Sequence, residues 1–193
     1  MSKLEDLIKK LCPDGVDKLM PLGEICSVFA GGDAPKNDMS KIKTEEFSIP
    51  IISNGIGENA FYGYTNKAKI TKPAVTVSAR GTIGYAEYRN YPYFPIVRLL
   101  SIIPNNAELD VKYLYYFLQG RKYDIPSSGI PQLTAPDIKQ IIIPVPPLQV
   151  QREIVQILDN FTELTAELTA RKKQYEYYRD KLLSLNDLER GGV

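Results

Sequence analysis

The chain has 193 residues, of which 44% are hydrophobic and 24% charged, and its formal net charge is +1. This composition is typical of a globular protein with room for one ordinary domain and one long additional element. Histidine, the commonest general base and metal ligand, is absent, and no apolar run is long enough to span a membrane.

The N-terminal residues 2–11 predict a short amphipathic helix that ends before Pro13. Lysine and glutamate interrupt its apolar pattern, so the segment is not a signal peptide. Cys12 and Cys26 have no metal-ligand spacing. We therefore expect no metal, no cofactor and a reduced, cytoplasmic protein.

The next part of the chain predicts mostly β-structure. Residues 22–29 are expected to form a strand, Gly31-Gly32-Asp33 a turn, and residues 33–46 an exposed loop. Residues 47–103 hold short runs of branched and aromatic residues that Gly, Pro and Asn separate at hairpin-like spacing: IPIIS, NAFYGYT, AVTVSA, IGYAEY and VRLLSII.

Positive charge is concentrated within residues 60–103. This block has one acid, Glu87, and six cations: Lys67, Lys69, Lys72, Arg80, Arg89 and Arg98. The flanking segments are close to neutral or acidic. Such a local excess can supply an electrostatic surface for nucleic-acid phosphate even in a nearly neutral chain.

Within and next to this block, side chains suited to DNA contacts accompany the predicted hairpins. Arg80 precedes Gly81, and glycines at 81 and 84 let a backbone approach a ligand closely. Amides read base edges, cations meet phosphate, and tyrosines donate to phosphate or pack on sugar. The candidate contacts are Arg80, Lys67, Lys69, Asn54, Arg89, Tyr62, Tyr64 and Lys72. The alternative is a set of plain hairpins with exposed polar residues.

Beyond the β-rich part, residues 111–119 predict a helix, residues 121–136 an irregular segment, and residues 140–145 a short strand before Pro146-Pro147. Asp137 and Lys139 resemble half of a nuclease site, but no second carboxylate stands at a suitable spacing, and a loop entering a strand explains them better. We find no phosphate-binding glycine loop and no dinucleotide-binding motif. The sequence predicts no catalytic residues.

After the double proline, apolar residues recur at alternating intervals of three and four, which is typical of a coiled-coil seam. Nine of the ten seam positions are apolar or aromatic: Ile154, Ile157, Phe161, Leu164, Leu168, Arg171, Tyr175, Tyr178, Leu182 and Leu185. At about 1.5 Å per residue the helix is roughly 48 Å long, so we expect it to need a partner helix. Arg171 either extends its charge to solvent or sets the register.

Four segments together resemble the DNA-specificity (S) subunits of type I restriction-modification enzymes. They are PLGEIC (21–26), VSARGTIGYA (77–86), LDVKYLYYFLQ (109–119) and IPQLTAPDIKQIIIPVPPLQVQREIVQILD (130–159). The last is the most specific, because it joins a Pro-Gln turn, an Ile-rich strand, a Pro-Pro junction and a Gln-Arg helix start in one order.

The resemblance implies an α+β fold in three parts. Residues 1–147 form a target-recognition domain of short β-strands and a few helices, residues 148–188 a long coiled-coil spacer helix, and residues 189–193 a tail. It also implies a non-catalytic subunit that reads one half of a split sequence in double-stranded DNA. The helix would dock methyltransferase (modification) subunits and, through them, the restriction subunit.

Family members usually carry two recognition domains and two long helices, whereas this chain has one of each, so we interpret it as a half-subunit. An unpaired seam then predicts a homodimer of antiparallel helices that reads an interrupted palindrome. Two alternatives stay open. One is a stand-alone enzyme with its own recognition domain; the other is a coiled-coil DNA-binding regulator or non-productive decoy of the modification complex.

Overall fold

The computed structural model describes residues 2–15, 18–105, 107–123 and 131–184. They fall into two compact units that divide between Val155 and Gln156. The predicted seam residue Leu185 and the predicted tail at 189–193 lie outside the described residues. No helix of the described ranges combines the length and the apolar character needed to cross a membrane.

The predicted N-terminal helix is confirmed as α1 (Lys3–Leu11). The Ser2 hydroxyl accepts a hydrogen bond from the Glu5 backbone at 3.3 Å, and the Glu5 carboxylate accepts one from the Ser2 backbone at 2.8 Å. This reciprocal capping box satisfies two N–H groups that a helix start leaves free. Lys3 also forms an ion pair with Glu153, near the start of α5 (Leu148–Leu183).

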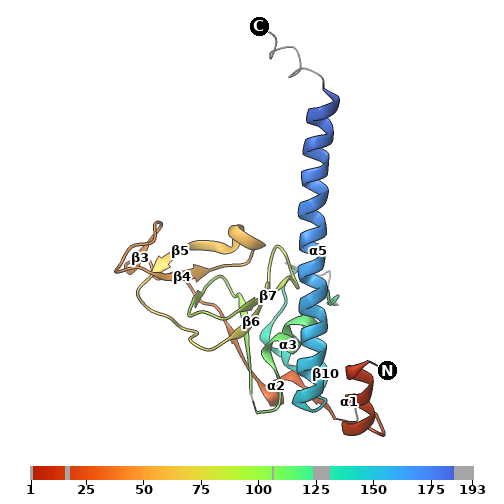
Figure 1. Ribbon diagram of the computed structural model, residues 1–193. Coiled ribbons are helices and arrows are strands. Elements are labelled where there is room, and N and C mark those ends of the chain that lie inside the picture. Colours follow the sequence, from red (N-terminus) through yellow and green to blue (C-terminus); the bar gives the residue numbers. More distant parts are fainter. Residues whose placement is uncertain (1, 16–17, 106, 124–130, 185–193) are drawn as a thin grey trace. The chain divides into compact units, whose positions relative to one another are not determined.

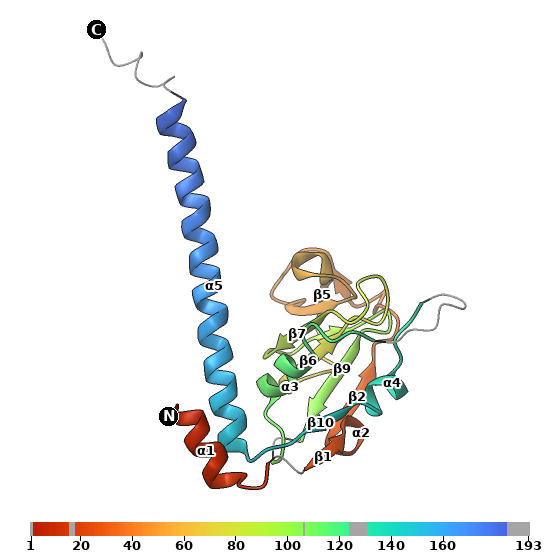
Figure 2. The same cartoon turned by 90° about the vertical axis from the view of Figure 1, so that its right-hand side faces the viewer.

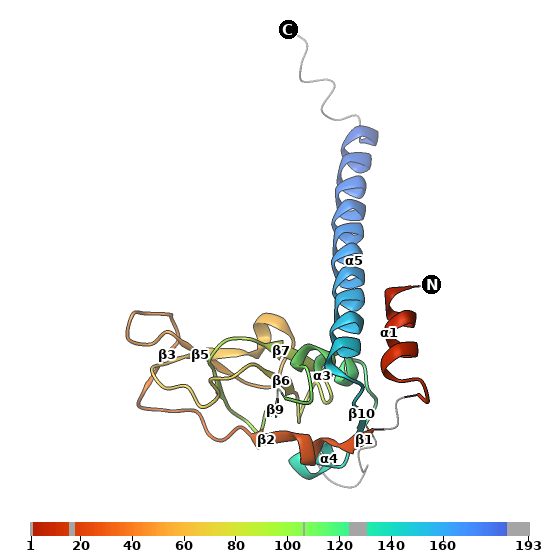
Figure 3. The ribbon, with the colours of Figure 1, turned by 60° about the horizontal axis from the view of Figure 1, so that its bottom comes forward.

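The predicted strand over residues 22–29 is wrong in its first half. Residues 22–25 form a helical turn, α2 (Leu22–Ile25), between strands β1 (Leu19–Pro21) and β2 (Cys26–Ala30). Leu22 and Ile25 stand three residues apart on one side of this turn and are 0% and 2% exposed. Strand β1 pairs antiparallel with β10 (Ile142–Pro144), the short strand predicted before the double proline (Figure 3).

The first four-stranded sheet is antiparallel, in the order β2-β9-β6-β7. The other strands are β6 (Ala74–Val77), β7 (Ala86–Arg89) and β9 (Leu100–Pro104). Alternate residues, such as Val75, Val77 and Ile102, enter the main core on one face. The opposite face carries the side chains between them, including Thr76 and Ser101, which are also buried.

A second four-stranded sheet, in the order β3-β5-β4-β8, lies next to the first (Figure 1). Its strands are β3 (Met39–Ser40), β4 (Ile49–Ile52), β5 (Phe61–Thr65) and β8 (Phe94–Pro95), with the 3₁₀ turn η1 (Gly57–Ala60) before β5. Strands β4 and β8 run parallel, which hairpin spacing did not predict. The five runs expected as strands within residues 47–103 contain β4, β5, β6, β7 and β9, but the last run is wrong in its first part, because residues 97–99 form a turn and β9 begins at Leu100.

Two helices cover the main core in addition to α2. The predicted helix α3 (Val111–Leu118) is confirmed; it begins after Asp110, whose carboxylate accepts hydrogen bonds from two backbone N–H groups. Figure 1 shows α3 on the side of β6 and β7 that is away from β4 and β5. The other is α4 (Ala135–Lys139), which lies beside α2 and β2 (Figure 2).

The long helix predicted after Pro146-Pro147 is confirmed as α5, which has 36 residues. Gln151 fixes its first turns to the main unit and is completely buried. Its amide group donates to the carbonyls of Glu108 and Pro146 at 2.9 and 2.7 Å and accepts from the Asp110 backbone at 2.8 Å. The first two turns of the helix therefore belong to the main unit.

Candidate functional site

Arg80 lies in the turn of the β6–β7 hairpin, as the sequence predicts, and is half-buried. The turn is closed by Ser78 and Tyr85, whose backbone N···O distance is 2.9 Å. Gly84 has a φ of +84°, and a Cβ there would lie 2.8 Å from the Tyr123 ring, so only glycine fits. The hairpin thus follows a fixed path from β6 to β7.

The guanidinium of Arg80 is held by Gln132, which is part of the Pro-Gln turn of the sequence motif. The Arg80 Nε donates to Gln132 Oε1 at 2.9 Å, and the Arg80 Nη2 donates to the same oxygen. The backbone is held as well, because the Leu133 N–H donates to the Ala79 carbonyl at 2.9 Å. Arg80 therefore has a defined orientation and keeps N–H groups available for another acceptor.

Asn54 was predicted to read a base edge, but both ends of its amide are engaged within the protein. Its Nδ2 donates to the Val97 carbonyl at 2.6 Å, and its Oδ1 accepts from the Ala79 N–H at 2.8 Å. Asn54 therefore connects the segment after β4 with two other turns. This geometry gives it a positioning role, and we do not retain it as a direct contact.

Arg89 is also engaged within the protein and has only 3% of its side chain exposed. Its guanidinium donates to the Glu87 carboxylate at 2.8 Å and to the Tyr91 hydroxyl at 2.7 Å. Burial of an arginine requires such pairing, since an isolated charge in the interior is costly. Reaching DNA would break these bonds, so Arg89 is a structural residue of the sheet and not a contact we retain.

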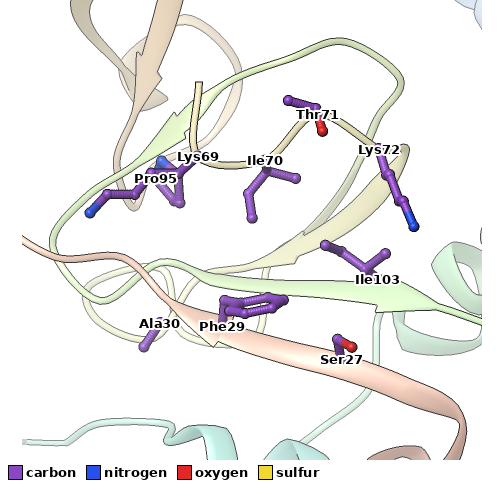
Figure 4. A pocket seen from close by; sticks show the side chains of 9 residues that line it. All are labelled: Ser27, Phe29, Ala30, Lys69, Ile70, Thr71, Lys72, Pro95 and Ile103. Carbon is purple, nitrogen blue, oxygen red and sulfur yellow. The ribbon is translucent and has the colours of Figure 1, made fainter. Parts of the chain in front are cut away.

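The three candidate lysines are exposed. Lys67 forms an ion pair with Asp38 at 2.8 Å, and the Lys69 ammonium lies 4.5 Å from the centre of the Phe94 ring. Lys69 and Lys72 line a cleft of about 570 Å³ between their segment and the face of β2 and β9. Phe29, 50% exposed, and Ile103 lie across it (Figure 4). The cleft therefore has two lysines on one side and apolar side chains on the other.

The two candidate tyrosines lie on β5. Tyr62 is 42% exposed and packs its ring under the Lys41 ammonium at 3.7 Å. Tyr64 lines a hollow of about 560 Å³ together with Phe61 and Tyr91. The contact residues kept as predictions are therefore Arg80, Lys67, Lys69, Lys72, Tyr62 and Tyr64.

Sequence reasoning gave Gln132 no role and counted Arg98 only as part of the charge block. Arg98 is exposed and follows Val97, whose carbonyl binds Asn54. The sequence could not assign either role, because the bond from Arg80 to Gln132 and the bond from the Arg98 backbone to Gly31 join residues far apart in the chain. Gly31 and Gly32, predicted as a turn, instead run beside residues 95–99, with Gly31 N–H donating to the Leu99 carbonyl at 2.9 Å.

The helix seam is exposed along most of its length. From residue 161 its apolar and aromatic members have more than half of their surface exposed: Phe161, Leu164, Leu168, Tyr175, Tyr178 and Leu182. Ile154 packs at the margin of the main core, and Ile157 is half-buried. Arg171 pairs with Glu167 of its own helix at 3.0 Å. The exposed seam fits the predicted need for a partner helix.

The segment PDIK is a short helix and not the loop that the sequence suggested. The Asp137 carboxylate accepts hydrogen bonds from the Thr134 N–H at 2.7 Å and from its hydroxyl at 2.5 Å, which caps α4. Lys139 ends the helix. Among the residues that the structure describes, no three acidic or cysteine side chains gather as a metal site would require.

Comparison with known proteins identifies the family. Residues 15–175 match the family model described as type I restriction modification DNA specificity domain. The chain therefore belongs to this family. It is 32% identical over 209 residues to the specificity subunit of the Escherichia coli type I restriction enzyme EcoR124I/EcoR124II, covering 98% of this chain and 49% of the relative. A Mycoplasma pneumoniae protein named as a candidate type I specificity subunit is 38% identical over 177 residues, covering 87% of this chain and 52% of the relative.

Solved structures show the same fold. The HsdS subunit of Thermoanaerobacter tengcongensis matches with a TM-score of 0.66 and 20% identity, over 93% of this chain and 47% of that one. A chain from a study of assembly and conformational transition in the type I restriction-modification system matches with a TM-score of 0.70 and 20% identity, over 93% and 48%. The chain spans about half the length of the relatives it matches.

Proposed function

We propose that this member of the type I DNA-specificity family reads one half of a split sequence in double-stranded DNA, with Arg80 as the principal base contact. The observation that carries the proposal is the double hydrogen bond from the Arg80 guanidinium to Gln132. A guanidinium held in one orientation suits guanine, whose two acceptors lie at fixed positions in the major groove. The exposed lysines at 67, 69 and 72 would meet phosphate.

The second part of the proposal concerns the long helix. An apolar seam exposed over more than five turns is stabilised when it packs against another helix of the same pattern. We infer that two copies of this chain pack antiparallel through it, and that the assembled helices dock methyltransferase subunits of a type I system and, through them, its restriction subunit. The relatives' names as specificity subunits support this assignment. The chemistry then resides in the partners, in the cytoplasm where bacterial DNA lies.

The test is selection of bound duplexes from a random library by the purified chain, followed by sequencing. A sequence of two inverted half-sites separated by a spacer of constant length is expected. Arg80→Ala should lower affinity for the selected site by about 5- to 150-fold, since one good bidentate arginine contact contributes about 1–3 kcal/mol.

Lys173→Ala is the matched control, because Lys173 is exposed on α5 and stands two residues after Arg171, on the face away from the seam. It removes the same charge away from the hairpin and should leave affinity and preference unchanged. Failure of the wild-type chain to enrich any sequence would contradict recognition. Equal losses for the two variants would contradict the role of Arg80. Addition of the modification subunits should then give methylation at the selected site; a complex that binds the site without methylating it would instead support a non-productive decoy.

A further inference from the structure

The turn at residues 96–99 has an uncommon backbone. Val97 and Arg98 have φ values of +53° and +60° and are the only non-glycine residues of the described ranges with positive φ. The Leu99 N–H donates to the Ile96 carbonyl at 3.0 Å, which closes a turn with two consecutive left-handed residues. Glycine and asparagine are usual at such positions, whereas a β-branched valine is strained there.

This strained turn is held from two sides. The Val97 N–H donates to the Gly32 carbonyl at 2.8 Å, and the Arg98 N–H donates to the Gly31 carbonyl at 2.9 Å. The chains approach so closely that a Cβ on Gly31 would lie 2.7 Å from the backbone at residues 95 and 96. The Asn54 amide completes the support by donating to the Val97 carbonyl. The backbone is thus fixed, while the side chains of Val97 and Arg98 are exposed.

The same Asn54 amide links this turn to the hairpin that carries Arg80. Its two ends bind the Val97 carbonyl and the Ala79 N–H, at 2.6 and 2.8 Å. The bonded atoms are therefore within about 8 Å of one another, given hydrogen bonds of ordinary length at both ends of one amide. Arg98 and Arg80 follow these two residues directly. With base pairs about 3.4 Å apart, both side chains fall within reach of the same few nucleotides.

We propose that Arg98 is a DNA phosphate contact and that Asn54 is the positioning residue that sets it at a fixed spacing from Arg80. The proposal rests on the proposed function and adds a division of labour. Arg80 is oriented by Gln132, as reading a base edge requires. Arg98 makes no ion pair with the described residues and is exposed, which suits a charge contact that does not depend on sequence.

The first experiment measures binding of the full chain to the selected duplex and to a scrambled duplex over a range of salt concentrations. Loss of one phosphate contact should reduce the slope of log K against log salt by about 0.9 and weaken binding about five-fold at 0.15 M salt. We expect this from Arg98→Ala on both duplexes. Arg80→Ala should reduce binding mainly to the selected duplex. An unchanged slope for Arg98→Ala overturns the phosphate contact.

The second experiment tests the positioning role. Asn54→Asp keeps an oxygen acceptor for the Ala79 N–H and loses the donor to the Val97 carbonyl. Asn59→Asp is the matched control, since it adds the same charge to an exposed position of the same segment. After the effect of Asn59→Asp is subtracted, Asn54→Asp should reduce the slope of log K against log salt as much as Arg98→Ala does. The double variant with Asn54→Asp and Arg98→Ala should show little further reduction. Additive losses would overturn the link, because coupled residues give non-additive effects.

Thermal melting checks that each variant is folded. If Asn54→Asp does not fold, Asn54→Ala provides the same test, because it removes both amide hydrogen bonds, to the Val97 carbonyl and from the Ala79 N–H, without adding a charge. It should weaken binding to both duplexes, and a binding constant equal to that of wild type would overturn the need for a fixed turn. The scrambled duplex separates the two proposals: Arg98 can be tested on it even if the chain selects no sequence.

Discussion

The exposed helix seam gives the sharpest test of the proposed dimer. Leu168 is 70% exposed in the single chain. Complete burial of a leucine side chain contributes about 1.5–3 kcal/mol, so covering the exposed share contributes about 1–2 kcal/mol per copy. A two-fold interface contains the residue twice, and Leu168→Glu should therefore cost about 2–4 kcal/mol of dimerisation free energy. That corresponds to a dissociation constant about 30- to 700-fold higher.

Sedimentation velocity over a range of protein concentrations measures this constant directly. The matched control is Ala166→Glu, which introduces the same charge two residues earlier, on the opposite face of the helix. It should leave the dissociation constant within about two-fold of wild type. Circular dichroism shows whether both variants keep the helix. A wild-type chain that stays monomeric at every concentration, or equal effects of the two glutamates, would contradict dimerisation through the seam.

Three further predictions concern the main unit. Arg89→Ala should lower stability by about 2–3 kcal/mol, somewhat less than for a fully buried pair because Glu87 keeps 29% of its side chain exposed, and chemical denaturation measures this loss. Burial raises the pKa of the Cys26 thiol to about 12, so in a Cys12→Ser background the folded protein should resist alkylation at pH 8 and react only when unfolded. Val97→Asn should raise stability by about 1 kcal/mol in the same denaturation assay, because asparagine adopts positive φ more readily than valine, and an unchanged midpoint would contradict strain in this turn.

The sign of the Cys26 effect on stability follows from its direction of shift. The folded state holds the thiol proton more tightly than the unfolded chain, whose thiol titrates near 9. The contribution of the Cys26 thiol to the free energy of unfolding is therefore fully present below pH 9 and is lost as the pH rises through 12. Burial also raises the pKa of Tyr93 from 10 to about 12, so the two groups destabilise the fold together at alkaline pH.

Features with local causes were the ones that the sequence predicted well. The first helix carries its own capping box, α3 follows the Asp110 cap, and α5 begins directly after two prolines. Each of these signals acts within a few residues, so a sequence pattern contains the whole of it. The family resemblance rests on similar local segments, and the family match over residues 15–175 confirms it.

Features with distant partners were not predictable in this way. The LGEI segment looks like a strand by composition, but Leu22 donates its N–H to the Ile141 carbonyl, more than a hundred residues later, and forms a helical turn against the core. Asn54 and Arg89 have the right chemistry for DNA, yet both are engaged within the protein. An exposed contact and a buried structural residue have the same sequence signature, and only the tertiary partners distinguish them.

The long helix α5 and the turns that carry Arg80 and Arg98 both contribute to the free energy of DNA binding. One arginine contact contributes about 1–3 kcal/mol, whereas specific binding typically exceeds non-specific binding by about 4–10 kcal/mol. A single recognition unit with one oriented arginine therefore falls short of that range unless its contacts are duplicated. Pairing through the seam supplies the second copy and converts its binding into an intramolecular step, provided that the half-sites stand at the spacing the helices impose. Leu168→Glu should consequently weaken DNA binding, although Leu168 lies on the helix seam and is not a proposed DNA contact. A change in the length of DNA between the two half-sites should weaken binding in the same way.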